Sequence, residues 1–301
     1  MSGTTAIATF YHVPGHVYHF ASSALVSFFA RVHYLEKNFT VEERHRHIVE
    51  ENSGFDRAVL VTRSRDMSAW SRAFAALVFS QEARVSYVDD ISGLIATAPV
   101  CFSRAVVLGK SIDLFSGSWD AVRFREMVAI QMGVAFSKEI VTVCLRRDSR
   151  RLLNGDELVA FIRQESMGLE VVAVYFEDLS FAEQVALMAR SAVFVSIHGA
   201  AFTNTIFLPA GAAVVEISPF RFNYNLYQRI AIRAGLMYVR YVASFEEMEY
   251  SSEISDIVSE MTNRQCNNVD PNCLDYMREV DVTVNIERFR SYYEAALDVI
   301  E

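Results

Sequence analysis

The stretch that decides the fold is Ala192–Ile217, which reads AVFVSIHGAAFTNTIFLPAGAAVVEI. Short β-branched runs stand near its two ends, Val193–Ile197 and Ala213–Ile217, and such runs are typical of buried strands. The residues that interrupt its apolar character are His198, Asn204, Pro209, Gly211 and Glu216. We therefore predict strand, turn, helix and strand here, rather than a membrane span of about 20 uninterrupted apolar residues.

The rest of the chain repeats this alternation of strand and helix. The strands that we expect in the first half are Ala6–Tyr11, Arg57–Thr62, Val85–Val88 and Arg104–Leu108. The helices expected there are Val17–Leu35, Met67–Ser80 and Trp119–Met132. Further strands expected in the second half are Val141–Leu145, Glu170–Tyr175 and Met237–Val242. Near-continuous apolar strands joined by helices imply parallel sheets that are covered on both faces.

Local signals mark the helices of the second half. Asn154 stands before two acidic residues, and Ser180 precedes Glu183 by three positions. Each pattern predicts a capping side chain followed by an acidic first turn. Gly235 follows the expected helix Tyr224–Ala234, as a left-handed C-terminal cap does.

Two sheets of this kind in 301 residues predict an α/β fold of two Rossmann-like domains whose parallel sheets face each other across a cleft. We place the first domain at residues 1–135 and the second at residues 136–283. The last helix, Val284–Ile300, has an amphipathic pattern. It either crosses back onto the first domain, to which our assignment joins residues 284–301, or covers the second.

The charge of the chain limits its partners. A net charge of −9 argues against sequence-independent nucleic-acid binding, which depends on Lys and Arg that neutralise phosphates. The acidic stretch Glu246–Glu260 is expected at the surface. The N-terminus lacks the charged and apolar regions of a secretion signal, so we expect a soluble protein of the cytoplasm with no transmembrane segment. The alternative is a lumenal enzyme from which the anchor has been removed.

The four cysteines do not form a disulfide framework in a chain of this length. Cys101 and Cys144 lie near or within apolar strand patterns and are expected in the core. Cys266 and Cys273 are close enough in sequence to pair, but without a secretion signal we expect them to be reduced.

Arginines gather directly after the expected strand Val141–Leu145; they are Arg146, Arg147, Arg150 and Arg151. The carboxyl ends of parallel strands are where ligands bind in open α/β sheets. A guanidinium recognises phosphate through a planar fork of donors. The cluster therefore predicts a diphosphate site, and the alternative is a solvated basic loop.

A second candidate segment follows the strand Val193–Ile197. Small residues let a ligand approach the backbone at this turn, and a helix that starts here offers amide donors to an anion; they are Gly199, Ala200 and Ala201. His198 is expected either to hydrogen-bond a phosphate or sugar hydroxyl, or to be a buried structural histidine. Glu216 stands in an apolar strand, where an unpaired carboxylate is costly, so we expect a ribose diol or an internal Arg or Ser as its partner.

Taken together, these segments resemble the signature region of glycosyltransferase family 61. The segments that carry the resemblance are Arg146–Asn154, Phe176–Gln184, His198–Asn204, Phe207–Gly211 and Val214–Ile217. The family includes plant xylosyl- and arabinosyltransferases and animal transferases of N-acetylglucosamine. The resemblance implies a GT-B fold, an inverting mechanism, a UDP-sugar donor and no required metal or other cofactor.

The resemblance also implies roles for individual residues. Without a metal, fixed donors must stabilise the leaving diphosphate, and we assign this to Arg146, Arg150 or Arg151 and to the turn Gly199–Ala201. Glu216 is expected to hold the ribose. Asn204 or His198 is expected to contact the phosphates.

The catalytic base is expected near the first helix. The segment His12–Phe20 resembles an Asn-x-Gly-His turn of the family, whose Gly-His pair is kept here as Gly15 and His16. The acidic position that follows in relatives is His19 or Phe20 here. Inversion needs a base that removes the proton of the acceptor hydroxyl. We prefer His16 and then His19, because an imidazole with an ordinary pKa is largely neutral at working pH.

The predicted activity is transfer of a sugar from a UDP-sugar to a hydroxyl of an oligosaccharide or glycoprotein. Xylose is the first expectation for the sugar, followed by N-acetylglucosamine or arabinose. Two alternatives remain from other functional classes. One is a UDP-sugar-binding protein without catalysis, and the other is a GT-B-shaped epimerase that acts on the UDP-sugar itself.

Overall fold

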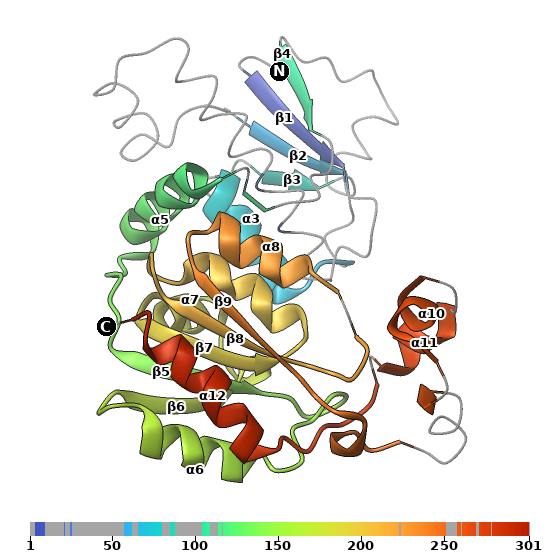
Figure 1. Cartoon of the computed structure of the whole chain (residues 1–301). Helices are drawn as coiled ribbons and strands as arrows, with labels where there is room; N and C mark the ends of the chain where they lie inside the picture. Colours follow the sequence, from blue (N-terminus) through green and yellow to red (C-terminus); the bar gives the residue numbers. More distant parts are fainter. Residues whose placement is uncertain are drawn as a thin grey trace. The chain divides into compact units, whose positions relative to one another are not determined.

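The computed structural model describes residues 4–9, 21, 25, 57–61, 66–79, 85–87, 104–108, 114–115, 117–222, 224–250, 258–259, 261–268, 271–277 and 279–300. The chain divides into two compact units, Met1–Gly133 and Val134–Glu301, and each contains one parallel sheet (Figure 1). The boundary predicted from the sequence, between residues 135 and 136, lies two residues beyond the observed one. Within the described ranges, no helix is both long and apolar enough to cross a membrane.

The first unit contains a sheet of four parallel strands in the order β3-β2-β1-β4. The strands are Thr4–Thr9 (β1), Arg57–Val61 (β2), Val85–Tyr87 (β3) and Arg104–Leu108 (β4). These are the four strands that the sequence predicts, with shifts of up to two residues at their ends. The expected helix Val17–Leu35 lies outside the described residues except at positions 21 and 25, which are helical.

Two described helices accompany this sheet, Ala69–Phe79 (α3) and Ser118–Met132 (α5). Trp70 is buried and stacks on Phe74. Trp119 is not packed in the core, since it is 43% exposed. Its ring instead lies under the guanidinium of Arg123, one turn further along the helix.

The second unit contains a sheet of five parallel strands in the order β6-β5-β7-β8-β9. The strands are Ile140–Leu145 (β5), Glu170–Tyr175 (β6), Ser191–Ile197 (β7), Ala213–Ser218 (β8) and Met237–Val242 (β9). Every residue of β7 and β8 is buried, because these strands are central and are covered on both faces. The fold is thus α/β with parallel sheets, as predicted; the GT-B arrangement of the two units stays a prediction.

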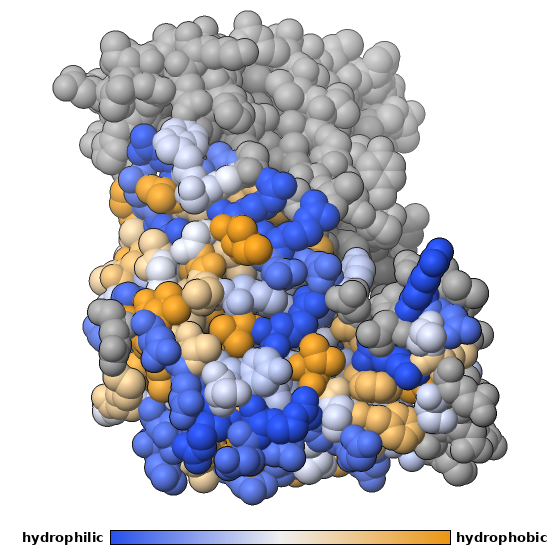
Figure 2. Space-filling view, in the orientation of Figure 1, coloured by the Kyte–Doolittle hydropathy of each residue, from blue (hydrophilic) through white to orange (hydrophobic). Residues whose placement is uncertain are grey.

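The longer helices of the second unit are Gly155–Glu165 (α6), Phe181–Ala189 (α7), Leu226–Arg233 (α8) and Ile286–Leu297 (α12). The shorter segments are Phe176–Asp178 (η4), Ala200–Phe207 (η5), Phe245–Glu247 (η6), Asn263–Asn268 (α10) and Pro271–Met277 (α11). Hydrophilic residues cover the part of the surface over α6, and hydrophobic residues elsewhere on this face are scattered (Figure 2).

The structure tests the predicted helix caps. Ser180 and Glu183 form a reciprocal capping box at the start of α7, and Gly235 has φ 71° after α8, so both predictions are confirmed. Asn154 is the N-cap residue of α6 and two acidic residues follow in the first turn, as predicted, but its side chain makes no capping hydrogen bond. Instead it exchanges two hydrogen bonds with the backbone of Val284, which fixes the segment that leads into α12.

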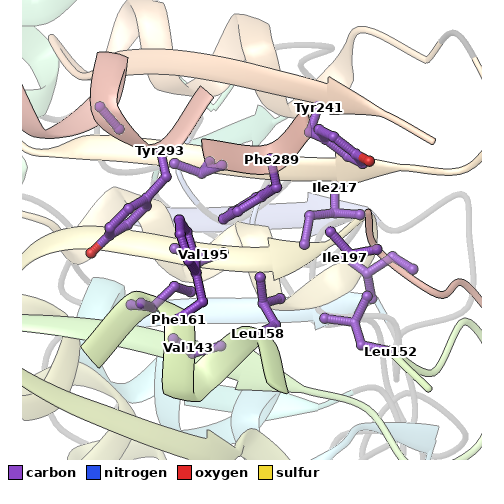
Figure 3. Packing of buried hydrophobic residues seen from close by; sticks show 14 of the residues in the cluster. Val143, Leu152, Leu158, Phe161, Val195, Ile197, Ile217, Tyr241, Phe289 and Tyr293 are labelled. Atoms are coloured by element: carbon purple, nitrogen blue, oxygen red, sulfur yellow. The ribbon is translucent and has the colours of Figure 1, made fainter. Parts of the chain in front are cut away.

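Helix α12 packs on the sheet of the second unit and contacts β8 and β9. Phe289 and Tyr293 are fully buried and meet Phe161 of α6, and Phe289 also meets Tyr241 of β9 (Figure 3). Burying each such aromatic ring stabilises the fold by about 1.5–3 kcal/mol. The helix therefore covers the second unit, and our assignment of residues 284–301 to the first is corrected.

The acidic stretch that begins at Glu246 is not wholly at the surface. Glu247 is 8% exposed, and its carboxylate accepts hydrogen bonds from the hydroxyl of Tyr241, the backbone amides of Ser244 and Asn285, and the guanidinium of Arg288. These donors compensate for the burial of the charge. The carboxylate thereby joins η6 to the start of α12.

Cys266 and Cys273 form a disulfide, which corrects the expectation that they are reduced. Their Cα atoms are 5.1 Å apart, within the range that a disulfide needs, because α10 and α11 pack against each other. The bridge lies in a small buried cluster with Phe222 and Met277. Cys144 is buried with a free thiol, as predicted for a core residue, and burial raises the pKa of this thiol to about 12.

Candidate functional site

The two segments that the sequence singled out meet at one edge of the second sheet. Strands β5 and β7 are parallel neighbours, so the loops that follow them leave from the same edge. Arg146 donates from Nε to the backbone oxygen of Ser149 at 2.8 Å. Its guanidinium lies against Gly199, since a β-carbon at residue 199 would come within 2.3 Å of Nη1.

The four arginines after β5 have different partners. Arg147 donates two hydrogen bonds to Asp178, at 2.6 and 2.5 Å, and lies over the ring of Tyr175. Arg151 donates side-chain hydrogen bonds to Asp281, at 2.8 and 2.6 Å. Hydrogen bonds to these carboxylates raise the pKa of both guanidinium groups above the usual value. The guanidinium groups of Arg147 and Arg151 are thus each paired with a carboxylate.

Arg146 and Arg150 belong to the neighbourhood of His198 instead. Among the described residues, no carboxylate forms an ion pair with Arg146. Arg150 has φ 55°, a left-handed conformation that is uncommon for a residue with a side chain, and its charge helps to lower the pKa of His198. The structure therefore brings these two cations together with the turn after β7, and it leaves Arg151 with Asp281.

His198 is buried, with 5% of its surface exposed, and Nδ1 lies 2.5 Å from Oε1 of Glu216 on β8. Phe222 and Tyr227 pack on the imidazole, with ring centroids 4.5 and 4.8 Å away. Burial lowers the pKa of His198 below its usual value, although Glu216 opposes the shift. The ring is therefore neutral near pH 7.

Glu216 has no exposed surface, and both of its oxygens have internal partners. Oε2 accepts a hydrogen bond from the hydroxyl of Tyr238 at 2.5 Å, and Arg240 in turn donates from Nε to that hydroxyl oxygen at 2.8 Å. An internal partner was one of the two alternatives for Glu216, but it is His198 and Tyr238 rather than Arg or Ser. Both carboxylate oxygens are thus engaged within the second unit, and a contact of Glu216 with the ribose stays a prediction.

Tyr238 and Arg240 were not among the site residues predicted from the sequence. They are two residues apart on β9, so they share one face of the strand, and β9 pairs with β8 in a register that sets Arg240 beside Glu216. Arg240 also donates to the side chain of Asn225 at 2.8 Å. The alternation of polar residues in a predicted strand is the signal that could have found the pair.

The turn after β7 differs in part from the prediction. Gly199 has an extended backbone, with φ 172°, and Ala200 and Ala201 open the expected helix, which is the 3-10 helix η5. Asn204 is 2% exposed, and its amide donates to the side chain of Gln184 in α7 at 3.2 Å. The structure thus places Asn204 in a contact between η5 and α7. His16 and His19 lie outside the described residues.

The sequence profile of the family described as Glycosyltransferase 61 matches residues 17–215. This match covers the arginine cluster and the turn at His198, which meet in the structure. The chain belongs to the glycosyltransferase 61 family. The membership that the sequence motifs suggested is therefore confirmed.

Several curated proteins are similar to part of this glycosyltransferase 61 member. The human protein O-linked-mannose beta-1,4-N-acetylglucosaminyltransferase 2 is 39% identical over 114 residues, which are 37% of this chain and 19% of the human protein. Its namesake from Canis lupus familiaris is 37% identical over 116 residues, 38% of this chain and 20% of that protein. The matches therefore span about a fifth of the length of these relatives.

A solved structure, dodecameric iron-containing heptosyltransferase TibC in complex with ADP-D-beta-D-heptose, is similar over 99% of this chain and 77% of its own. The TM-score is 0.39 and the sequence identity is 12%. A likeness at this level carries no argument about the site of this glycosyltransferase 61 member.

Proposed function

We propose that this chain is a glycosyltransferase that takes its sugar from a UDP-sugar and holds the diphosphate with Arg146 and Arg150. The observation that carries the proposal is the position of Arg146 against Gly199, where the loops after β5 and β7 meet. Arg146 has no carboxylate partner among the described residues, so its guanidinium keeps its charge for an anion, and its planar fork fits a diphosphate. The glycine beneath it leaves room for this guanidinium to lie against the backbone.

N-acetylglucosamine is the sugar that we propose first. The similar proteins are named as N-acetylglucosaminyltransferases, whereas xylose was the first expectation from sequence motifs alone. Xylose and arabinose remain the alternatives for the donor. The proposed acceptor is a hydroxyl of an oligosaccharide or glycoprotein.

The proposed mechanism is inverting and needs no metal. The acceptor oxygen attacks the anomeric carbon from the face opposite UDP, while a base takes its proton. His16, and after it His19, remains our proposal for this base. As the bond to the sugar breaks, negative charge grows on the UDP diphosphate, and the fixed donors of Arg146 and Arg150 stabilise it.

The disulfide between Cys266 and Cys273 bears on where the protein works. Disulfides form and persist in oxidising compartments and are rare in the cytosol. We therefore propose an oxidising compartment in place of the cytoplasm that the sequence suggested. The sequence around the bridge offers no metal spacing that would explain the two thiols otherwise.

Calorimetry with UDP, UDP-N-acetylglucosamine, UDP-xylose and UDP-arabinose tests donor binding, with and without a chelator. We expect one UDP-sugar to bind and chelator to have no effect, and we expect Arg146→Ala to weaken binding about tenfold or more. Arg147→Ala is the matched control, because this neighbouring arginine is paired with Asp178 and should bind the donor like wild type. An equal loss of donor affinity in both variants would contradict the assignment of Arg146 as a diphosphate ligand.

Product analysis separates the functional classes. Transfer to a glycan or glycoprotein hydroxyl supports the proposed activity. Donor binding without any transfer would favour a binding protein, and conversion of the UDP-sugar without an acceptor would favour an epimerase. If the wild-type chain binds no uridine nucleotide, the proposed function is wrong.

A further inference from the structure

A line of hydrogen bonds runs from β9 through β8 to His198, the residue that follows β7. Nε of Arg240 donates to the hydroxyl oxygen of Tyr238, this hydroxyl lies against Oε2 of Glu216, and Oε1 of Glu216 lies against Nδ1 of His198. The three contacts measure 2.8, 2.5 and 2.5 Å. All four side chains belong to the second unit, on β8, β9 and the residue after β7.

The chemistry of these groups fixes the direction of every hydrogen bond. A guanidinium only donates, so Arg240 occupies an acceptor site on the oxygen of Tyr238 and turns its proton toward Glu216. A carboxylate only accepts, so the proton between Glu216 and His198 belongs to Nδ1. The neutral imidazole therefore carries its hydrogen on Nδ1, and Nε2 presents a lone pair.

The surroundings keep the imidazole neutral, and Nδ1 is the ring nitrogen that Glu216 engages. The aromatic rings of Phe222, Tyr224 and Tyr227 pack around it, and the charges of Arg150 and Arg240 disfavour a second proton. Nε2 has no hydrogen-bond partner within the described part of the chain, and 6% of the side chain is exposed. A lone pair cannot donate to a phosphate oxygen, but it can accept from a hydroxyl.

We infer that Tyr238 and Arg240 are positioning residues that fix His198 as the Nδ1-protonated tautomer, so that Nε2 accepts a hydrogen bond from a hydroxyl of the bound nucleotide-sugar. This deepens the proposed function and rests on it for the identity of the ligand. The hydroxyl belongs to the ribose or to the transferred sugar. In either case His198 accepts a hydrogen bond from a hydroxyl of the nucleotide-sugar, and Arg146 and Arg150 bind its phosphates.

Glu216→Gln gives a test with a defined direction. Because Arg240 still makes Tyr238 donate, the carbonyl oxygen of the new amide must face Tyr238, and its NH2 group must face Nδ1 of His198. The proton of His198 then moves to Nε2, which becomes a donor. In Glu216→Gln with Tyr238→Phe, the amide can turn its oxygen back to Nδ1, and the original tautomer returns.

Imidazole NMR of the ligand-free full chain measures the tautomer directly, with the signals of His198 assigned by their loss in His198→Asn. We expect the Nδ1-protonated form in wild type, the Nε2-protonated form in Glu216→Gln, and recovery of the first form in the double variant. A wild-type ring protonated on Nε2, or a double variant that stays flipped, overturns the inferred role of Tyr238 and Arg240. Circular dichroism identifies any variant that fails to fold. In that case Tyr238→Phe alone serves as the test, and we expect His198 to titrate at a higher pH in this variant than in wild type.

Calorimetry with UDP, 2′-deoxy-UDP, 3′-deoxy-UDP and UDP-N-acetylglucosamine locates the hydroxyl. If the hydroxyl belongs to the ribose, wild type should bind the deoxy analogue that lacks it about tenfold more weakly than UDP. If the hydroxyl belongs to the transferred sugar, wild type should bind UDP-N-acetylglucosamine about tenfold more tightly than UDP. Glu216→Gln should abolish that preference, and the double variant should restore it. Preferences that are equal in all three proteins overturn the hydroxyl contact. If wild type binds no uridine nucleotide, the proposed function and this contact both fail, while the NMR result still decides the tautomer.

Discussion

The guanidinium of Arg146 and the backbone of Gly199 lie in direct contact, although 53 residues separate them in the sequence (199 − 146). A β-carbon at residue 199 would approach Nη1 of Arg146 to 2.3 Å. The glycine is needed for space and not for its backbone angles, since φ 172° is accessible to any residue. This contact joins the two sequence motifs into one candidate site.

Gly199→Ala should displace the guanidinium of Arg146 without unfolding the chain, because the clash is with the end of a flexible side chain. We expect affinity for UDP to fall about tenfold and the melting temperature to stay within about 2 °C of wild type. Gly117→Ala is the control, since its added carbon would meet nothing within 4 Å. Calorimetry and thermal unfolding measure both effects. Wild-type affinity in Gly199→Ala would show that the position of Arg146 does not matter for binding.

Arg151→Ala should affect stability and leave nucleotide binding unchanged. Arg151 pairs with Asp281, and the backbone amide of Arg151 donates to the same carboxylate at 2.6 Å. We expect a lower melting temperature and a UDP affinity within roughly twofold of wild type, as for an ion pair remote from the ligand. Loss of UDP binding at an unchanged melting temperature would indicate that Arg151 binds the diphosphate, as the sequence motifs implied.

Glu247→Ala should destabilise the second unit by about 2–4 kcal/mol, because four donors lose a common buried acceptor. Urea unfolding of the two proteins at the same pH measures the difference in the free energy of unfolding. The matched control is Glu246→Ala, whose side chain is exposed next to it in the chain. Similar unfolding curves for the two variants would contradict the role of Glu247 as a buried link.

The free energy of unfolding should depend on pH through His198. Burial lowers the pKa of its imidazole in the folded state, so the unfolded chain binds more protons below the unfolded pKa of about 6.5. Stability is therefore present above that pH and is lost as the pH falls toward the lowered folded pKa. We expect wild type to lose more stability than His198→Asn between about pH 7 and pH 5. Parallel curves for the two proteins would show that His198 does not titrate differently on folding.

The disulfide can be checked by alkylation of the denatured protein and mass spectrometry. Residues 265–278 form one tryptic peptide that contains Cys266 and Cys273. In protein made in an oxidising compartment, we expect this peptide to take up no alkyl group until a reductant is added. Cys144 serves as the internal control, since its thiol is free and should react once the chain is denatured. Alkylation of both bridge cysteines without reductant would show that the pair does not form.

The sequence was most informative where the signal is local. The alternation of apolar strands and helices predicted all nine described strands within two residues at their ends, and Ser180 and Glu183 predicted a capping box that the structure contains. It was least informative about the partners of polar side chains. Asn154 resembles a cap but bonds to Val284, 130 residues further on, and nothing near it in the sequence indicates that choice.

The sequence by itself determined the order of the strands and helices, and it placed Arg146, Arg150 and His198 at the carboxyl ends of strands, because these features depend on residues a few positions apart. Only the tertiary structure decided which of these residues act together. The register between β8 and β9 sets Arg240 beside Glu216, and the packing of α10 on α11 brings Cys266 to Cys273. Such contacts form when the sheet and its covering helices assemble, since burial forces each polar group to take the nearest complementary partner in space, whatever its distance along the chain.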